Sequence, residues 1–248
     1  MKNLGLDGWL LINKPIGISS FKALFPIKRL LNNLSDTKIK VGHAGTLDPE
    51  ASGLLLVGIG KATKLMQYAV NANKEYEFAI KWGEKTTTDD HTGVIISASN
   101  ITPELNDINK IIPQFEGSIK QIPPQYSSLR VNGRRAYMLA RQKKEFCLKS
   151  RDVIVNSLEI ISHDIKTRCT KLRVNCSSGF YIRSLARDMG DVLRCYGHTI
   201  SIYRTKISDF LVENSHNLEY IIKLAATSVS TFEQWFHVNI KPLNIIFK

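Results

Sequence analysis

The segment from Val41 to Lys64 constrains the fold of this chain most, because it places an aspartate between glycine-rich and apolar residues. Its glycines permit backbone conformations that other residues resist, and Pro49 fixes the backbone directly after Asp48. The run from Gly53 to Ile59 is almost wholly apolar, as in a strand that is buried on both faces. The sequence therefore predicts a carboxylate displayed on a stiff loop that leads into the core, although an Asp-Pro pair is also typical of an ordinary turn or helix cap.

A Gly-Lys pair near the end of this segment, Gly60-Lys61, raises the question of a phosphate-binding loop. Such a loop has a glycine five residues before the pair, where Leu55 stands, and Ser or Thr directly after the lysine, where Ala62 stands. Both positions fail, so the sequence does not indicate a nucleotide-binding P-loop.

The chain has 248 residues, of which 43% are hydrophobic, enough for one large domain or two small ones with a sizeable core. Lysine and arginine number 34 against 22 acidic residues, which gives a formal net charge of +12. A basic surplus of this size favours a polyanionic partner, most simply a nucleic acid. A soluble basic protein without such a partner is the alternative.

The four cysteines form no Cys-x-x-Cys pair, and the histidines show no metal-ligand spacing. Neither a metal site nor a disulfide framework is therefore indicated, and we expect a cytoplasmic protein. The N-terminus lacks the features of a signal peptide, and no apolar run is long enough to cross a bilayer, so we expect no membrane association.

The whole central segment closely resembles the motif of the tRNA pseudouridine-55 synthase (TruB) family, roughly G-H-x-G-T-L-D-P-x-A-x-G-x-L followed by G-x-A-T-K. The positions that fit are Gly42, His43, Gly45, Thr46, Leu47, Asp48, Pro49, Ala51, Gly53, Gly60, Ala62, Thr63 and Lys64. In that family the aspartate is the catalytic nucleophile, so the resemblance implies that role for Asp48. It also implies that Thr46 supports the active site and that His43 fills the space vacated by flipped bases. On sequence alone, a single histidine in a glycine-rich loop is more typical of a turn residue.

Two motifs on either side of this segment extend the resemblance. Leu11–Ser20 matches the family's first motif, with Lys-Pro-x-Gly-x-[ST]-S at its centre, and implies that Lys14 supports the active-site loop. From Lys74 to Trp82 apolar and polar residues alternate, which predicts a half-buried strand with Tyr76 in the core. The family's Lys-x-Tyr at this point instead implies that Tyr76 stacks on the target base and takes part in proton transfer.

Two later motifs carry further candidate residues. The polar stretch Gly83–Gly93 is predicted to be a loop, and it resembles the family's G-x-x-T-x-T-x-D-x-x-G, which implies that Asp90 contacts RNA near the active site. Cys176–Leu185 has every fixed position of the motif C-x-x-G-x-Y-I-R-x-L, whose arginine pairs with the catalytic aspartate. The resemblance thus assigns this pairing to Arg183, and a guanidinium beside a carboxylate keeps the acid ionised.

The stretch Thr199–Phe210 resembles the closing strand of the family, with Ile202 where an active-site leucine is usual. Tyr203 and Ser208 depart from the usual arginine and glycine. Because neither belongs to the catalytic set, these departures bear on RNA affinity more than on chemistry.

A dense run of cations with interleaved aromatic residues lies between Arg130 and Arg151, which suits phosphates and exposed bases. A solvated helix face is the alternative. In the family, this segment, near 126–152, is a mobile thumb that clamps the RNA. The candidate RNA-binding residues in it are Arg130, Arg134, Arg141, Lys143 and Lys144.

The resemblance implies an α+β fold with a mixed, largely antiparallel sheet of the pseudouridine-synthase type, flanked by helices and RNA-binding loops. We expect a single catalytic domain over residues 1–248, with a short C-terminal tail at 211–248 and no C-terminal PUA domain. Predicted helices include one after Ser19-Ser20 that Pro26 kinks or restarts, one from Thr102-Pro103 to Pro113, and one near Asn217–Ala226.

The expected reaction isomerises uridine-55 in the T-loop of tRNA to pseudouridine, and it needs no redox cofactor, metal or nucleotide. The expected partner is the T-stem-loop of tRNA, bound by a monomer without a guide RNA. A guide-RNA-dependent synthase of the dyskerin type and a non-catalytic tRNA-binding or tRNA-folding protein are the alternatives. The sequence leaves open whether Asp48 attacks C1′ of the sugar or the uracil ring.

Overall fold

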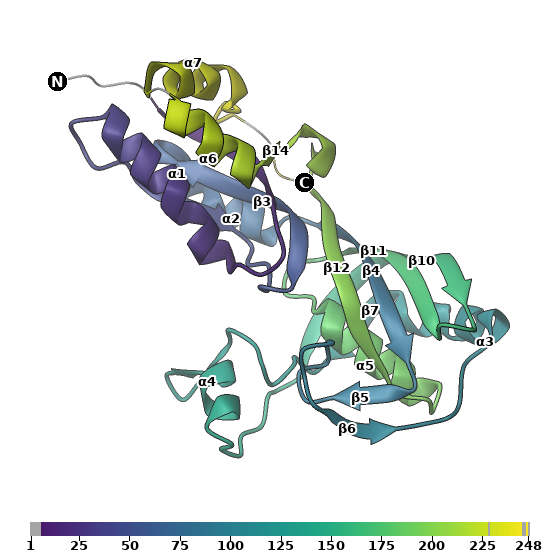
Figure 1. Ribbon diagram of the computed structural model, residues 1–248. Helices are drawn as coiled ribbons and strands as arrows, with labels where there is room; N and C mark the ends of the chain where they lie inside the picture. The colour runs from purple at the N-terminus through teal and green to yellow at the C-terminus, as the bar shows by residue number, and fades with distance from the viewer. Residues whose placement is uncertain (1–5, 228, 245–246, 248) are drawn as a thin grey trace. The chain divides into compact units, whose positions relative to one another are not determined.

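The computed structural model describes residues 6–227, 229–244 and 247 (Figure 1). The chain forms two compact units: residues 1–76 with 203–248, and residues 77–202. Strands β4 (Lys74–Trp82) and β12 (Gly197–Ile207) each cross the boundary, so the chain passes between the units within a strand. The prediction of one catalytic domain over 1–248 stays a prediction.

In the first unit, strand β3 (Ala51–Ile59) is the central element. It pairs antiparallel with β1 (Gly8–Lys14), in a register that sets Leu11 opposite Leu56, and with β2 (Val41–Ala44). At the edge, β14 (His216–Asn217) runs parallel to β1, and β13 (Phe210–Leu211) pairs antiparallel with the end of β12.

Strand β3 is buried on both faces, as its apolar sequence predicted. Because successive side chains of a strand point to opposite faces, Leu55 and Val57 join one core and Leu54 and Leu56 join another. The first core is covered by three helices, α1 (Ser20–Leu34), α6 (Leu218–Thr227) and α7 (Val229–Asn239). The second core is covered by shorter elements, namely the 3-10 helices η1 (Gly60–Leu65) and η3 (Val212–Asn214) and helix α2 (Met66–Asn71).

The second unit has its own antiparallel strands, in the order β4, β11 (Cys169–Cys176), β10 (Arg151–Asp164) and β7 (Gly117–Gln121). Two further elements matter for the site. One is the hairpin of β5 (Glu84–Thr86) and β6 (Ile95–Ala98), and the other is helix α5 (Ile182–Val192). Helix α3 (Leu105–Ile111) and the 3-10 helix η2 (Ile112–Phe115) precede β7.

A short hairpin and a helix follow β7 within the segment 126–152. Strands β8 (Arg130–Val131) and β9 (Arg134–Arg135) are joined by Asn132-Gly133, whose φ values of 50° and 79° fit a tight hairpin turn. Helix α4 (Ala136–Arg141) comes next, and residues 142–150 have no regular structure.

The predicted α+β class with a mixed, largely antiparallel sheet is confirmed. Three local expectations differ from the structure. Helix α1 runs continuously through Pro26, with buried residues on both sides of it, so the predicted restart was wrong and the predicted kink stays a prediction. Helix α3 begins at Leu105, because a capping box between Glu104 and Asp107 sets its start. The predicted loop Gly83–Gly93 begins with a strand, β5.

The predicted helix near Asn217–Ala226 is confirmed as α6, whereas α7 was missed. Both helices bring residues of the stretch 211–248 into the core of the first unit, among them Leu218 and Phe236. No helix among the described residues is long and apolar enough to span a membrane.

Candidate active site

Asp48 lies in the turn between β2 and β3, and the backbone on both sides of it is held by hydrogen bonds. The Ser20 hydroxyl accepts from the Leu47 N–H and donates to the Leu47 carbonyl, each at 2.8 Å. On the other side, the Gly17 N–H donates to the Pro49 carbonyl at 2.9 Å. The motif that contains Lys14 and the start of α1 thus fixes the loop, and the half-buried Asp48 is positioned by its neighbours.

Lys14 is fully buried, and its ammonium group donates to three backbone carbonyls. They belong to Pro15 and Ile18, both at 2.8 Å, and to Pro49 at 3.3 Å. Burial lowers the pKa of Lys14 from 10.5 to about 8, against the opposing effect of the Asp48 and Glu50 carboxylates. The structure therefore agrees with a supporting role for Lys14 beside the loop.

Arg204 on β12 is a site residue that the sequence reasoning missed. It is fully buried and ties the two ends of the Asp48 loop together: Nε donates to the Leu54 carbonyl at 2.8 Å, and Nη2 donates to the Gly45 carbonyl at 3.0 Å. Its Nη1 is buried and has no hydrogen-bond partner among the described residues. A side chain on Gly53 would collide with the Arg204 backbone, so glycine is required there.

The Arg204 guanidinium also lies beside two predicted site residues. Its central carbon is 5.9 Å from the centroid of the Tyr76 ring, which is 8% exposed. Burial and the nearby Arg204 charge lower the pKa of His43, so this imidazole is neutral at pH 7. The one sequence signal for Arg204 was its place in the closing-strand motif, directly after Tyr203, which stands where the family usually has an arginine.

Thr46, which was predicted to support the active site, is exposed on the loop that contains Asp48.

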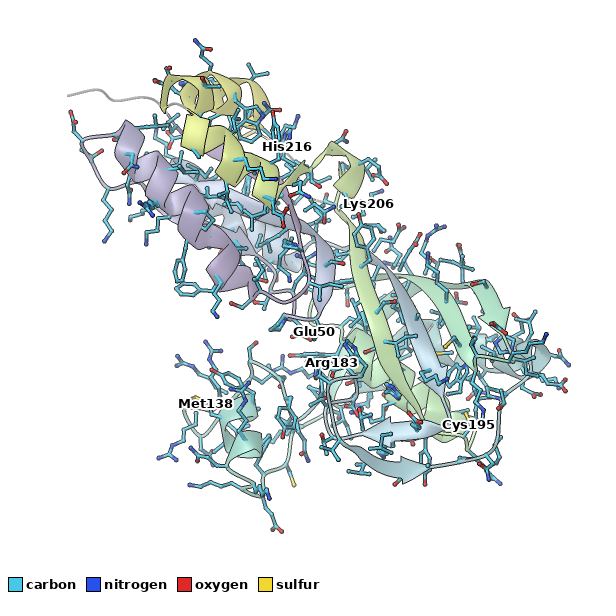
Figure 2. All side chains as sticks on the ribbon, in the orientation of Figure 1. Glu50, Met138, Arg183, Cys195, Lys206 and His216 are labelled. Atoms are coloured by element: carbon cyan, nitrogen blue, oxygen red, sulfur yellow. The ribbon has the colours of Figure 1, made fainter. Side chains whose placement is uncertain are left out.

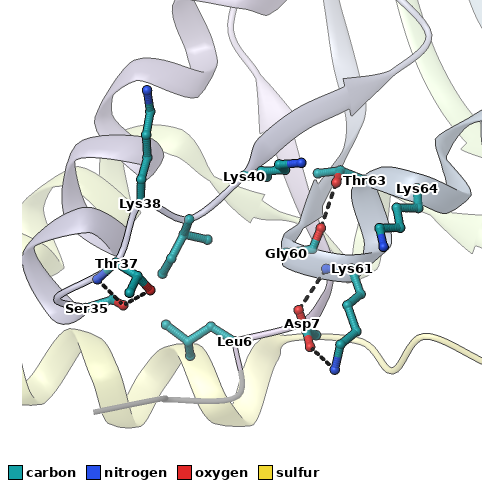
Figure 3. A pocket seen from close by; sticks show the side chains of 11 residues that line it. Leu6, Asp7, Ser35, Thr37, Lys38, Lys40, Gly60, Lys61, Thr63 and Lys64 are labelled. Carbon is teal, nitrogen blue, oxygen red and sulfur yellow. Dashed lines mark hydrogen bonds and ion pairs between the residues drawn. The ribbon is translucent and has the colours of Figure 1, made fainter. Parts of the chain in front are cut away.

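The segment that follows β3 is not a P-loop. Asp7 accepts from the Lys61 N–H at 2.7 Å and pairs with the Lys61 ammonium at 3.0 Å, while the Thr63 hydroxyl donates to the Gly60 carbonyl at 2.7 Å (Figure 3). The Asp7 carboxylate thus already accepts from the Lys61 N–H, a backbone donor that a phosphate in a P-loop would need. The adjoining pocket of about 310 Å³ is lined by four lysines, Lys38, Lys40, Lys61 and Lys64, which make this surface cationic.

In the second unit, Arg183 lies in the first turn of α5 and is 4% exposed (Figure 2). Its guanidinium donates to the Thr88 carbonyl at 2.8 Å and to the Tyr126 carbonyl at 3.0 Å, and it lies 3.7 Å from the Asp90 carboxylate. Arg183 therefore connects the loop after β5 with the start of the segment 126–152. Its predicted pairing with Asp48 joins residues of different units and stays a prediction.

Asp90 organises its own loop. One carboxylate oxygen accepts from the Thr88 hydroxyl at 2.7 Å, from the Thr92 N–H at 3.0 Å and from the Thr92 hydroxyl at 2.6 Å. Asp90 is 9% exposed, and an RNA contact for it remains a prediction.

The preceding residue, Asp89, was missed by the sequence reasoning. It is buried with a φ of 58° and forms an ion pair of 2.9 Å with Arg187 of α5. Burial raises the pKa of Asp89, while Arg187 and Arg183 oppose this effect. This ion pair holds the loop that contains Asp89 and Asp90 against α5, because Arg187 lies on that helix one turn after Arg183.

The predicted RNA-binding residues of the segment 126–152 are all exposed: Arg130, Arg134, Arg141, Lys143 and Lys144. Helix α4, around Met138, presents side chains on several sides (Figure 2), and the Arg141 guanidinium carbon lies 5.5 Å from the Tyr137 ring centroid. RNA binding by these residues and mobility of the segment stay predictions. Ile202 is half-buried on β12, and its contact with a base is also a prediction.

The described residues contain no group of three or more His, Cys, Asp or Glu side chains that would hold a metal ion, and the four cysteines are free thiols.

The sequence matches known proteins over most of its length. Residues 28–182 match the TruB family pseudouridylate synthase N-terminal domain. The chain is 46% identical to the tRNA pseudouridine synthase B of Ehrlichia ruminantium (strain Gardel), over 86% of this chain and 70% of that protein. It is 41% identical to the protein of the same name from Ehrlichia canis (strain Jake), over 97% of this chain and 79% of that protein.

The fold is similar to that of a chain in the crystal structure of a Cbf5-Nop10-Gar1 complex, with a TM-score of 0.69 and 26% identity. That match covers 95% of this chain and 60% of the other. The sequence matches and the fold confirm the predicted family, and this chain belongs to the TruB family of pseudouridylate synthases.

Proposed function

We propose that this protein converts uridine-55 in the T-loop of tRNA to pseudouridine, with Asp48 as the nucleophile. The observation that carries the proposal is the Asp48 loop, in which hydrogen bonds to Leu47 and Pro49 hold the backbone on both sides of Asp48. Family membership supports the reaction type, and the relatives named tRNA pseudouridine synthase B support tRNA as the substrate.

The proposed reaction is an isomerisation. The bond between N1 of uracil and C1′ of ribose breaks, a bond between C5 and C1′ forms, C5 loses its proton and N1 gains one. Atoms and electrons therefore balance without an oxidant or reductant. An ionised carboxylate can supply the covalent intermediate by attacking either C1′ or the uracil ring, and both routes begin from the same position of Asp48.

The other residues have roles around this carboxylate. Tyr76 stacks on the flipped uracil and takes part in proton transfer, and Ile202 packs against the base. The family resemblance supports a further part of the proposal, in which the planar guanidinium of Arg183 pairs with the Asp48 carboxylate and orients it. His43, which is neutral at pH 7, occupies the space left by the flipped base, a role that suits an uncharged ring better than a cation.

The cationic surfaces supply RNA affinity. The exposed arginines and lysines of the segment 126–152 bind phosphates of the T-stem-loop and clamp the RNA, and Asp90 contributes from the neighbouring loop. We propose a cytoplasmic monomer that acts without a guide RNA.

The test is to incubate the purified protein with an unmodified tRNA transcript, without any guide RNA, and to map pseudouridine at single-nucleotide resolution. We expect stoichiometric conversion at position 55, and no conversion in a transcript with cytidine at that position. Conversion that requires an added guide RNA would instead support the dyskerin-type alternative. Tight binding of the transcript without conversion would support a non-catalytic tRNA-binding protein.

A further inference from the structure

Helix α1 exposes two phenylalanines on its solvent side. Phe21 is 63% exposed and Phe25 is 51% exposed, and their rings meet edge to face with centroids 4.9 Å apart. The opposite face of α1 is buried in the core through Ala23, Ile27 and Leu31. The solvent face of such a helix is normally polar, so an adjacent pair of exposed aromatic rings is a feature that core packing does not explain.

The pair follows directly after the residue that bonds the Asp48 loop. Ser20, whose hydroxyl bonds the backbone of Leu47, immediately precedes Phe21 in the chain. Phe25 follows about one helical turn later, roughly 6 Å along the axis. The two rings therefore extend from the point where α1 bonds the Asp48 loop, and we take nucleotides next to a target base at Asp48 as the ones that would meet them.

The charges around the pair favour a polyanion. Helix α1 contains Lys22, Lys28 and Arg29 and no acidic residue, and these three side chains are exposed. Aromatic rings flanked by cations are typical of surfaces that bind single-stranded nucleic acid, where bases stack on the rings and the cations follow the backbone.

A groove beside Phe25 adds room for the edge of a base. It has a volume of about 520 Å³, and among the described residues its walls contain no carboxylate. The side chains of Pro26, Leu30 and Ile222 form apolar walls, while Arg29 and Asn33 supply hydrogen-bonding groups. Such a mixture suits a planar ring with polar edges.

We propose that Phe21 and Phe25 form a stacking platform for an unpaired nucleotide of the substrate RNA that neighbours the target uridine. The platform binds the base through the aromatic faces, and Arg29 and Asn33 contact its edge from the groove. This inference rests on the proposed function, because it takes the RNA held at Asp48 as the occupant.

The test combines changes in the protein with changes in the RNA. The dissociation constant of a T-arm stem-loop is measured for wild type, for Phe21→Ala/Phe25→Ala, and for Phe21→Leu/Phe25→Leu, which keeps the apolar volume but removes the aromatic faces. Tyr220→Ala, which removes a half-exposed ring from α6, is the matched control. Each unpaired loop nucleotide except the target is also replaced in turn by an abasic residue.

We expect the double alanine variant to bind about tenfold more weakly or worse, since stacking of a base contributes about 1–3 kcal/mol. The double leucine variant should recover little of this affinity, and Tyr220→Ala should bind as wild type. One abasic position should weaken binding by the wild type but cause no further weakening in the alanine variant, which identifies the stacked nucleotide. The salt dependence of binding should not change, because no cationic side chain is removed.

Several outcomes would overturn the platform while leaving the proposed function intact. One is binding by the double alanine variant within twofold of an active wild type, and another is wild-type affinity in the double leucine variant. A wild type that forms a dimer and an alanine variant that is a monomer would also overturn it, in favour of contact with a second copy of the chain. Failure of the wild type itself to bind and convert the RNA would overturn both proposals, and this outcome is visible before any variant is compared.

Discussion

Ser20 and Leu47 are joined by two hydrogen bonds of 2.8 Å, in which one hydroxyl group satisfies both the N–H and the carbonyl of the residue before Asp48. Ser20 is 1% exposed and Leu47 is 3% exposed, so water does not compete for these groups. The start of α1 therefore fixes the backbone directly before Asp48. Precise placement of a nucleophile before substrate binds is a large part of how an enzyme lowers its barrier.

We predict that Ser20→Ala lowers the free energy of unfolding by about 1–3 kcal/mol, because both backbone groups of Leu47 lose their buried partner. It should also lower kcat by about tenfold or more, since the loop is no longer fixed. The matched control is Ser19→Ala, which removes the N-cap bond to the Lys22 N–H and should cost about 1 kcal/mol without lowering kcat. Equal kcat values for the two variants, from single-turnover assays, would argue against a positioning role for Ser20.

Arg204→Met should destabilise the first unit, because the buried Leu54 carbonyl and the half-buried Gly45 carbonyl lose the guanidinium donor, at about 1–3 kcal/mol for the buried group. The pKa of His43 should rise, since the Arg204 charge is one of the two causes that lower it. Titration of the His43 ring by NMR measures this directly. The control is Lys206→Met, which also removes one positive charge from β12 and should leave the His43 pKa at its wild-type value.

The fold class was predicted from the family resemblance. Two individual strands were predictable from periodicity, because the apolar run Gly53–Ile59 and the alternation from Lys74 to Trp82 are typical of buried and half-buried strands. Helix α7 was missed because its sequence, with Ser230, Thr231 and His237 among the aromatics, gives a weak amphipathic pattern. Its place is set by tertiary packing, as Phe232 and Phe236 insert into the core with α1.

The residues that hold the site were harder to predict than the site itself. Asp48 was recognisable from its motif, whereas the bonds from Arg204 to Gly45 and Leu54 join positions about 150 residues apart and follow no local pattern. The Asp89–Arg187 pair is a similar case, because it depends on a residue with positive φ and on the packing of α5. Such contacts arise from the three-dimensional arrangement, which sequence periodicity does not encode.

Lys14 predicts a specific pH dependence of stability. Its folded-state pKa of about 8 lies below the ordinary value of 10.5, so the unfolded chain binds more protons between these pH values and the folded state gains stability as pH rises from 8 to 10.5. We expect the free energy of unfolding of the wild type to rise in this window relative to Lys14→Met. Parallel pH profiles, measured by denaturant unfolding, would contradict a lowered pKa.

The segment 126–152 should contribute to RNA affinity through charge. Replacing Arg141, Lys143 and Lys144 together by alanine should weaken tRNA binding and flatten its salt dependence by about 0.7–0.9 for each phosphate that the variant no longer neutralises. Turnover at saturating RNA should change less, because we assign these residues to phosphates and not to the reacting base. The control replaces Lys110, Lys120 and Lys166, three exposed lysines elsewhere in the second unit, and should leave the salt slope unchanged. A slope that stays the same in the first triple variant would show that the RNA takes another path.

The most direct test of the account is single-turnover pseudouridine formation by Asp48→Asn, measured together with the dissociation constant of the same tRNA. Amide and carboxylate have a similar shape, but only the carboxylate is a nucleophile, so turnover should be abolished while binding stays within a few-fold of wild type. Turnover within tenfold of wild type by a preparation free of other synthases would contradict the assignment of Asp48 as the nucleophile.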